Sequence, residues 1–128
     1  MLLQSVHHIA IICNNYQVSK KFYTHILGLT IIKETYRAER KSYKLDLGLD
    51  GKYIIELFSF ENAPARPSKP EALGLRHIAF AVANVPATVN YLLTHQIIAE
   101  PIRIDEHTNK QFTFIADPDG LPIEFYQK

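Results

Sequence analysis

The sequence contains an internal repeat, which limits the chain to folds built from two similar halves. Val6–Ile12 aligns with Leu75–Ala81, and each residue of the second segment lies 69 positions after its counterpart in the first. Further matches follow along the chain, the second after one residue is dropped: Asp50-Gly51 with Asp119-Gly120, and Ile55–Phe58 with Ile123–Tyr126. Self-similarity at a fixed separation indicates a supersecondary unit that occurs twice.

The composition is that of one globular domain. The chain has 128 residues, of which 47% are hydrophobic and 21% are charged, as in an average soluble domain. With 14 Lys and Arg against 13 Asp and Glu, the net charge of +1 argues against nucleic acid as a partner. Cys13 is the only cysteine, so no intrachain disulfide can form. No apolar run approaches the ~20 residues of a membrane helix, and the start lacks signal-peptide character, so we expect a cytoplasmic protein.

Both halves predict the same order of elements, a strand, a helix and three further strands. In the first half we expect strands at 5–13, 30–38, 42–48 and 52–59, with a helix capped by Asn14 or Asn15 and ended by Gly28. In the second half we expect strands at 75–83, 97–104, 110–116 and 121–127, with a helix at 85–95. The prediction is therefore a single α+β domain spanning 1–128, with modules at 1–59 and 75–128 and a linker at 60–74.

Four polar residues recur at equivalent places of the two halves: His8 and His77 near the first strands, and Glu56 and Glu124 in the last. Alternate side chains of a strand share a face, so all four point away from the apolar face that a helix would cover. A lone carboxylate buried in an apolar strand costs several kcal/mol unless it is paired or binds a metal. We therefore predict a divalent metal site, which suits Zn, Ni, Co, Mn or Fe(II). The same pattern also allows four ordinary half-exposed side chains.

The other polar residues do not repeat in register. We interpret His7, His25, His95 and His107 as surface or structural, with His7 on the face opposite to His8, and Cys13 as buried and inert. A group of cations in the second and third strands favours a solvated sheet edge over an anion-binding mouth: Arg37, Arg40, Lys41 and Lys44.

With these residues placed, the chain resembles the vicinal oxygen chelate superfamily, in its glyoxalase I branch. The resemblance covers nearly the whole chain and depends on five segments: His8–Ile11, Phe22–Gly28, Ile54–Leu57, Leu75–Phe80 and Asp117–Glu124. It implies two βαβββ modules in an eight-stranded incomplete barrel. It also implies a homodimer and a ligand set of His8, Glu56, His77 and Glu124, held within one chain or shared between two.

The resemblance further implies a lactoylglutathione lyase-like enzyme, which isomerises the hemithioacetal of methylglyoxal and a thiol through a metal-stabilised enediolate. It assigns Glu124 as the base, with Glu56 as a ligand that can share the proton transfer. Histidine at the first ligand position is similar to the type that uses Ni or Co in preference to Zn.

The substrate is less well defined by the resemblance. Two arginines of the glutathione-dependent enzymes are replaced here by Ile12 and Leu73, whereas Lys110 stands where some members bind glutathione. Arg37, Arg40 and Lys110 are weak candidates for substrate binding. The alternatives are a thiol transferase or dioxygenase of the same superfamily and a non-catalytic drug-binding protein of the bleomycin resistance kind.

Overall fold

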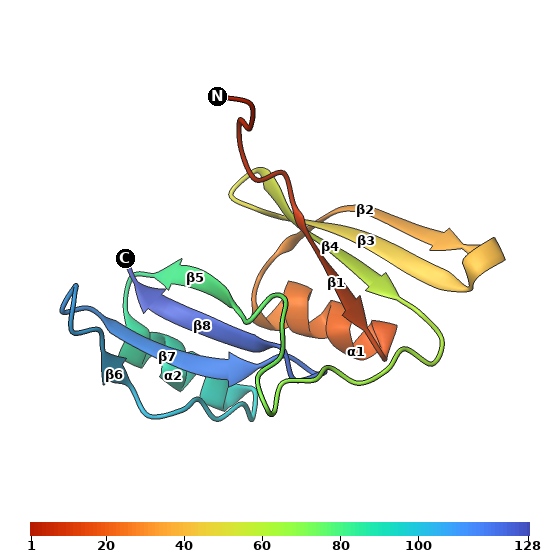
Figure 1. Cartoon of the computed structure of the whole chain (residues 1–128). Helices are drawn as coiled ribbons and strands as arrows, with labels where there is room; N and C mark the ends of the chain where they lie inside the picture. Colours follow the sequence, from red (N-terminus) through yellow and green to blue (C-terminus); the bar gives the residue numbers. More distant parts are fainter. The chain divides into compact units, whose positions relative to one another are not determined.

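Every residue from Met1 to Lys128 is described by the structure, a computed structural model. The chain forms two units, Met1–Ala65 and Arg66–Lys128, and the boundary falls inside the segment predicted as a linker. Both units contain four strands and a helix in the same order (Figure 1). None of the helices is both long and apolar enough to span a bilayer.

The first unit is a four-stranded mixed sheet with helical segments after its first strand. Its elements are β1 (Ile9–Cys13), α1 (Tyr16–Lys21), the π-helical turn η1 (Phe22–Ile26), β2 (Thr30–Arg37), the 3₁₀ turn η2 (Ala38–Arg40), β3 (Ser42–Leu49) and β4 (Lys52–Ser59). The strand order is β1-β4-β3-β2, in which β1 is parallel to β4 and the other pairs are antiparallel.

The second unit repeats this topology. Its elements are β5 (Ile78–Val82), α2 (Val85–Thr94), β6 (Arg103–Ile104), β7 (Gln111–Ala116) and β8 (Pro122–Gln127). The strand order is β5-β8-β7-β6, again with one parallel pair, β5 and β8, next to antiparallel pairs. The predicted α+β class and the duplicated strand-helix-strand-strand-strand unit are confirmed.

Strand alternation separates an apolar and a polar face in the first sheet. Leu45, Leu47 and Leu57 are fully buried, and Cys13 is buried as predicted. The helical side covers this face, since the ring of Tyr16 in α1 stacks on a tyrosine of β3 with 4.1 Å between ring centroids. The residues between the buried positions therefore project from the opposite face, which no helix of this unit covers.

The expected helix starts and turns are confirmed. Asn15 and Asn84 accept hydrogen bonds from Val18 and Ala87 backbone N–H groups, which caps both helices. Asp50 and Gly51 have φ angles of 51° and 76°, which a tight hairpin turn between two twisted strands requires.

Several elements differ from the prediction; in the second unit, for example, the strand expected from residue 75 begins at Ile78. The strand expected at 97–104 is reduced to Arg103–Ile104, because Pro101 lacks the N–H that a ladder needs. The strand expected from residue 5 begins at Ile9, since its ladder with β4 starts at Ile55 and residue 54 is outside the register. The first predicted helix is an α-helix that continues as a π-helical turn.

Candidate functional site

His8 and Glu56 form the first candidate pair, in the first unit. β1 runs parallel to β4 with Ala10 opposite Glu56, so the residue two places before Ala10 reaches the same face. The distance between His8 Nε2 and Glu56 Oε1 is 3.6 Å, and the two side chains are 34% and 15% exposed. An imidazole nitrogen and a carboxylate oxygen therefore converge at a site that solvent and ligands can still reach.

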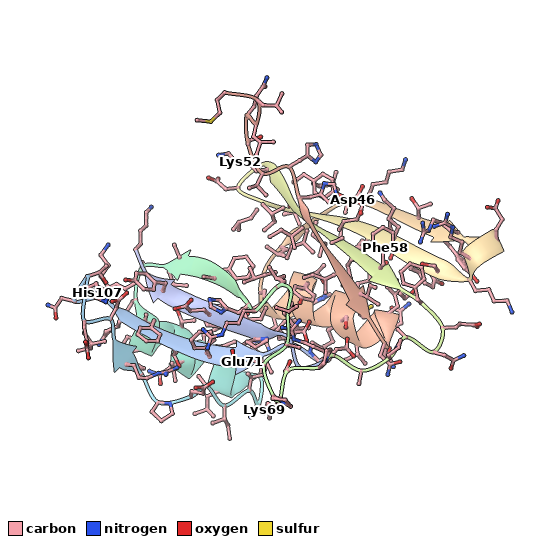
Figure 2. The ribbon with its side chains drawn as sticks, viewed as in Figure 1. Asp46, Lys52, Phe58, Lys69, Glu71 and His107 are labelled. Carbon is pink, nitrogen blue, oxygen red and sulfur yellow. The ribbon has the colours of Figure 1, made fainter.

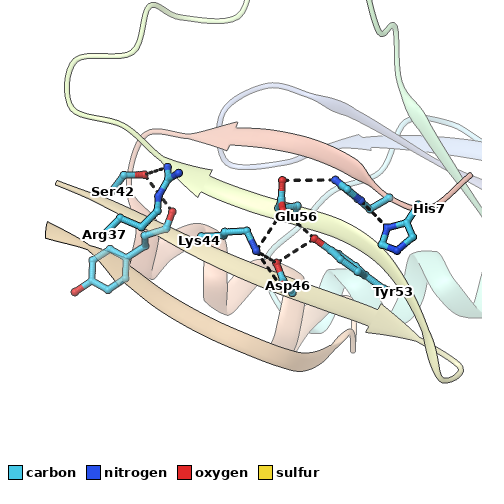
Figure 3. A network of polar contacts seen from close by, with 9 residues as sticks. His7, Arg37, Ser42, Lys44, Asp46, Tyr53 and Glu56 are labelled. Atoms are coloured by element: carbon cyan, nitrogen blue, oxygen red, sulfur yellow. Dashed lines mark hydrogen bonds and ion pairs between the residues drawn. The ribbon is translucent and has the colours of Figure 1, made fainter. Parts of the chain in front are cut away.

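A second carboxylate and a lysine complete this part of the face. Asp46 lies directly opposite Glu56 on the neighbouring strand. Lys44 Nζ donates to Asp46 Oδ1 at 2.9 Å and lies 3.3 Å from Glu56 Oε2 (Figure 3). The hydrogen bond to Asp46, and then that to Glu56, raise the pKa of the Lys44 ammonium despite partial burial. One cation thus compensates two facing carboxylates.

Tyr53 joins this cluster through an irregularity in β4. Gly48 of β3 is opposite Tyr53, and Leu47 is opposite Ile55, so one extra residue, Ile54, stands between the two pairs. Such a β-bulge reverses the alternation. The Tyr53 hydroxyl consequently reaches the polar face, where it lies 3.0 Å from Asp46 Oδ1 and 3.1 Å from Glu56 Oε2 as a donor. Burial, and then the two acceptors, raise the pKa of this phenol, which keeps it a donor.

His7 also belongs to this cluster, and its predicted position is wrong. Its Nδ1 lies 2.8 Å from His8 Nδ1, and its ring meets the ring of Tyr53 edge-on, with 5.3 Å between the centroids. His8 directly precedes β1, but His7 lies one residue further from the strand, so the alternation expected to separate the two rings does not extend to His7.

The second candidate pair, His77 and Glu124, lies in the second unit. Ala79 of β5 is opposite Glu124 of β8 in a parallel ladder, the same relation that Ala10 has to Glu56. The distance between His77 Nε2 and Glu124 Oε2 is 3.0 Å, and the side chains are 27% and 14% exposed. The two units therefore present the same pair of donor groups at equivalent places.

The surroundings of the second pair are aromatic. Phe114 lies opposite Glu124, at the position that Asp46 occupies in the first unit. Its ring meets the His77 ring edge-on, with 5.2 Å between the centroids. Arg103 lies over the ring of Phe112, which occupies the position of Lys44 in the ladder. The second pair therefore has neither the facing carboxylate nor the lysine of the first.

Two hollows open beside the second pair. Glu124 lines a pocket of about 290 Å³ together with Ile104, Phe112, Tyr126 and the loop residues 105–107. This loop, which carries His107 (Figure 2), is tied to β8 because the Tyr126 hydroxyl donates to Asp105 Oδ2 at 2.8 Å. His77 lines a larger cavity of about 980 Å³. The second unit thus has space for a small molecule next to both members of its pair.

The weaker candidates lie away from the two pairs. Arg37 donates to Ser42 Oγ at 3.0 Å and stacks over Phe58 of the same sheet, while its buried Nε has no acceptor. Arg40 is exposed in the turn η2. Lys110 precedes β7, and its backbone N–H donates to Thr108 Oγ1. None of them contacts His8, Glu56, His77 or Glu124.

Sequence reasoning missed three members of the first cluster. The cationic pattern of the second and third strands favours a solvated edge for Lys44, but Lys44 lies between two carboxylates. Asp46 alternates with two buried leucines in β3, and this position could have placed it on the polar face. Tyr53 carries no comparable signal, because only the bulge brings its ring to that face.

The donor atoms of the two pairs are of the kind that bind divalent transition metals. Each pair offers an imidazole nitrogen and a carboxylate oxygen, which are ordinary ligands of Zn, Ni and Co. Neither unit gathers three or more His, Cys, Asp or Glu side chains in an arrangement that holds a metal. Each unit therefore supplies two such ligands.

Comparison with known proteins agrees with this architecture. The family model described as the Glyoxalase/Bleomycin resistance protein/Dioxygenase superfamily matches residues 5–125. The protein YwkD of Bacillus subtilis (strain 168) is 57% identical over 128 residues, with all of both chains covered. YaeR of Escherichia coli (strain K12) is 56% identical over 126 residues and 98% of each chain.

A solved structure also matches nearly the whole chain. The crystal structure of the glyoxalase family protein from Enterococcus faecalis superposes with a TM-score of 0.90 at 44% identity, over 98% of this chain and 99% of that one. These likenesses concern the whole length of the chain, both repeated units included.

Proposed function

Since the chain belongs to the glyoxalase/bleomycin resistance protein/dioxygenase superfamily, we propose that it is a metal-dependent lyase of the glyoxalase I type. Its substrate is a small molecule with oxygens on adjacent carbons, such as the hemithioacetal of methylglyoxal and a thiol. The enzyme acts as a cytoplasmic homodimer.

One observation carries this proposal. His8 with Glu56 and His77 with Glu124 occupy equivalent positions of the two units, and in each pair Nε2 of the histidine faces a carboxylate oxygen, at 3.6 Å and 3.0 Å. A glutamate in an apolar strand is costly without such a partner. The repetition of this costly arrangement supports a shared purpose, for which metal ligation is the simplest chemistry.

We assign all four residues as ligands of one divalent ion, Ni or Co in preference to Zn, with Mn or Fe as further possibilities. When bound, the metal supplies a Lewis acid that stabilises the negative charge developing on the substrate oxygens. The remaining steps belong to side chains of this chain.

Glu124 is the proposed base. Its carboxylate forms an ion pair with His77 and accepts no hydrogen bond from a lysine or tyrosine as Glu56 does, and it lines a pocket, where a substrate carbon can approach it. In the proposed reaction it removes a proton from one carbon and returns it to the neighbouring carbon, while a second proton moves between the two oxygens. The hemithioacetal and the hydroxy thioester that forms contain the same atoms.

Glu56 has the more fixed role. Lys44 and Tyr53 both donate toward its Oε2, at 3.3 Å and 3.1 Å. Both donors hold the same oxygen of this carboxylate, Oε2, and so fix its orientation. These contacts support Glu56 as a ligand that at most shares the proton transfer.

Arg37, Arg40 and Lys110 are the proposed contacts of the substrate's thiol part. Their positive charges suit an anionic group of such a thiol, and the buried Nε–H of Arg37 has no acceptor in the protein.

The test is an assay of the metal-loaded protein against methylglyoxal adducts of several thiols. Protein loaded with Ni or Co should form the hydroxy thioester with at least one of glutathione and bacillithiol, and Glu124→Gln should lose about 100-fold or more of kcat. Absence of product with all thiols and with Ni, Co, Zn and Mn would reject the lyase. A protein that neither turns over nor binds metal would instead fit a drug-binding role.

A further inference from the structure

We propose that Tyr53 is the positioning residue of the metal centre, because it holds both ligands of the first unit, His8 and Glu56, in one arrangement. This inference rests on the proposed function, since it takes these two residues as ligands. The repeated sequence pattern contains only the four proposed ligands, and Tyr53 is not part of it.

The first contact of Tyr53 is with the carboxylate. Its hydroxyl donates toward Glu56 Oε2 at 3.1 Å and toward Asp46 Oδ1 at 3.0 Å, so one phenol proton is shared between two facing acceptors. Lys44 approaches the same Oε2 from β3. Both donors therefore hold one oxygen of Glu56, and the other oxygen, Oε1, is left toward His8 Nε2.

The second contact of Tyr53 is with the imidazole. The rings of Tyr53 and His8 are stacked, with 4.9 Å between centroids and 7° between planes. On the other edge of the His8 ring, its Nδ1 is engaged by His7 Nδ1 at 2.8 Å. The stack fixes the plane of the ring, and the contact at Nδ1 leaves Nε2 as the free nitrogen. Residues that surround metal ligands commonly fix both the orientation of an imidazole ring and the nitrogen that is free to bind.

The fold does not require this arrangement. Tyr53 reaches the polar face only through the bulge at Ile54, and the second unit forms the same sheet without a counterpart. There Phe114 meets His77 edge-on and brings no donor to Glu124. The bulge therefore brings Tyr53 to the first pair and restricts the movement of His8 and Glu56. His77 and Glu124, the proposed base, have no such contact and stay less constrained.

The experiment separates the two contacts of Tyr53 in the full-length protein. Tyr53→Phe keeps the stacked ring and removes the donor, whereas Tyr53→Leu removes both. Tyr36→Phe is the matched control, because Tyr36 also stacks on a neighbouring ring of this sheet and its hydroxyl makes no hydrogen bond. The readouts are the affinity for Co²⁺, by competition with a chelator, and the visible absorption spectrum of the cobalt-loaded protein.

We expect Tyr53→Phe to weaken Co²⁺ binding about 10-fold and Tyr53→Leu about 100-fold, the range found for residues that orient metal ligands. The visible bands of both variants should also shift, and Tyr36→Phe should match the wild type in both readouts. The thermal unfolding of each metal-free variant shows whether it is folded, and Tyr53→Phe keeps the test decisive if the leucine variant is not.

The outcomes distinguish this inference from the proposed function. A wild-type protein that does not bind Co²⁺ overturns both. If the wild type binds the ion and Tyr53→Phe binds it within twofold with an unchanged spectrum, then only the role of Tyr53 is wrong.

Discussion

Asp46 lies directly across the sheet from Glu56, so that two carboxylates face each other on neighbouring strands. Their side chains are 11% and 15% exposed, and two like charges at this separation repel each other. Lys44 is the cation that contacts both carboxylates. The stability of this part of the first sheet therefore depends on one ammonium group.

Replacing Lys44 by Met should lower the free energy of unfolding of the metal-free protein by about 1–3 kcal/mol, because the partly buried carboxylates lose their compensating charge. Urea denaturation at neutral pH measures this loss. Lys52→Met is the control, since Lys52 is exposed at the start of β4 and lies opposite Leu49. Equal stability of the two variants would show that Lys44 does not compensate the pair.

Leu57 is fully buried on the apolar face of β4. Leu57→Ala should cost about 2–5 kcal/mol, the loss of transferred surface together with the cavity that remains. Leu93→Ala removes the same atoms from an exposed position of α2 and should change the stability by less than about 0.5 kcal/mol. Denaturant midpoints of the two variants check the difference, and a small effect at Leu57 would place the core elsewhere.

Glu34 should make the stability of the first unit dependent on acid pH. The Lys20 ammonium, followed by the Tyr16 hydroxyl, holds the pKa of the Glu34 carboxyl below its ordinary value of 4.5. A folded pKa below the unfolded one gives stability that is complete above pH 4.5 and is lost as the pH falls through the folded value. The side chain is 36% exposed, so the contribution is about 0.5–1 kcal/mol.

Comparison of Glu34→Gln with the wild type tests this dependence. The variant should be less stable at pH 7, and the difference should disappear in acid as Glu34 of the wild type is protonated. Glu39→Gln, which changes an exposed carboxyl of the turn η2, should leave stability unchanged at both pH values. A difference that grows in acid would reverse the assigned direction.

Asn84 caps α2 through its side chain, which accepts from the Ala87 N–H at 2.9 Å. Asn84→Ala should cost about 0.5–2 kcal/mol, because that N–H loses its acceptor. Asn90→Ala changes the same residue type within the helix, where alanine is the better helix former, and should be neutral or stabilising. Thermal unfolding of both variants separates a cap effect from a general effect of removing an amide.

Much of the fold could be predicted because the sequence repeats and the strands alternate. The apolar faces follow from side-chain periodicity, and the helix starts at Asn15 and Asn84 follow from capping chemistry. The strand expected at 97–104 was overextended because its hydrophobic residues were followed and Pro101 was not. That proline lacks the N–H that a ladder needs, and the structure keeps only Arg103–Ile104 as a strand.

The sequence was sufficient to predict the two histidine–glutamate pairs of the candidate site. His8 and Glu56, like His77 and Glu124, fall together because alternation brings them to one face. The position of Tyr53 was not predictable, since a bulge reverses the alternation and residue types do not mark its place.

The central claim is that the two pairs hold one divalent ion, and equilibrium metal binding tests it most directly. Metal-free wild-type protein titrated with Ni²⁺ or Co²⁺ should bind one ion per chain, and should gain about 2.7 kcal/mol of stability at a free metal concentration of 100 times the Kd. His8→Ala and His77→Ala should each weaken the affinity at least 10-fold, whereas His25→Ala, an exposed histidine of the turn η1, should not. Failure of the wild type to bind either ion, or equal affinity in all three variants, would contradict the account.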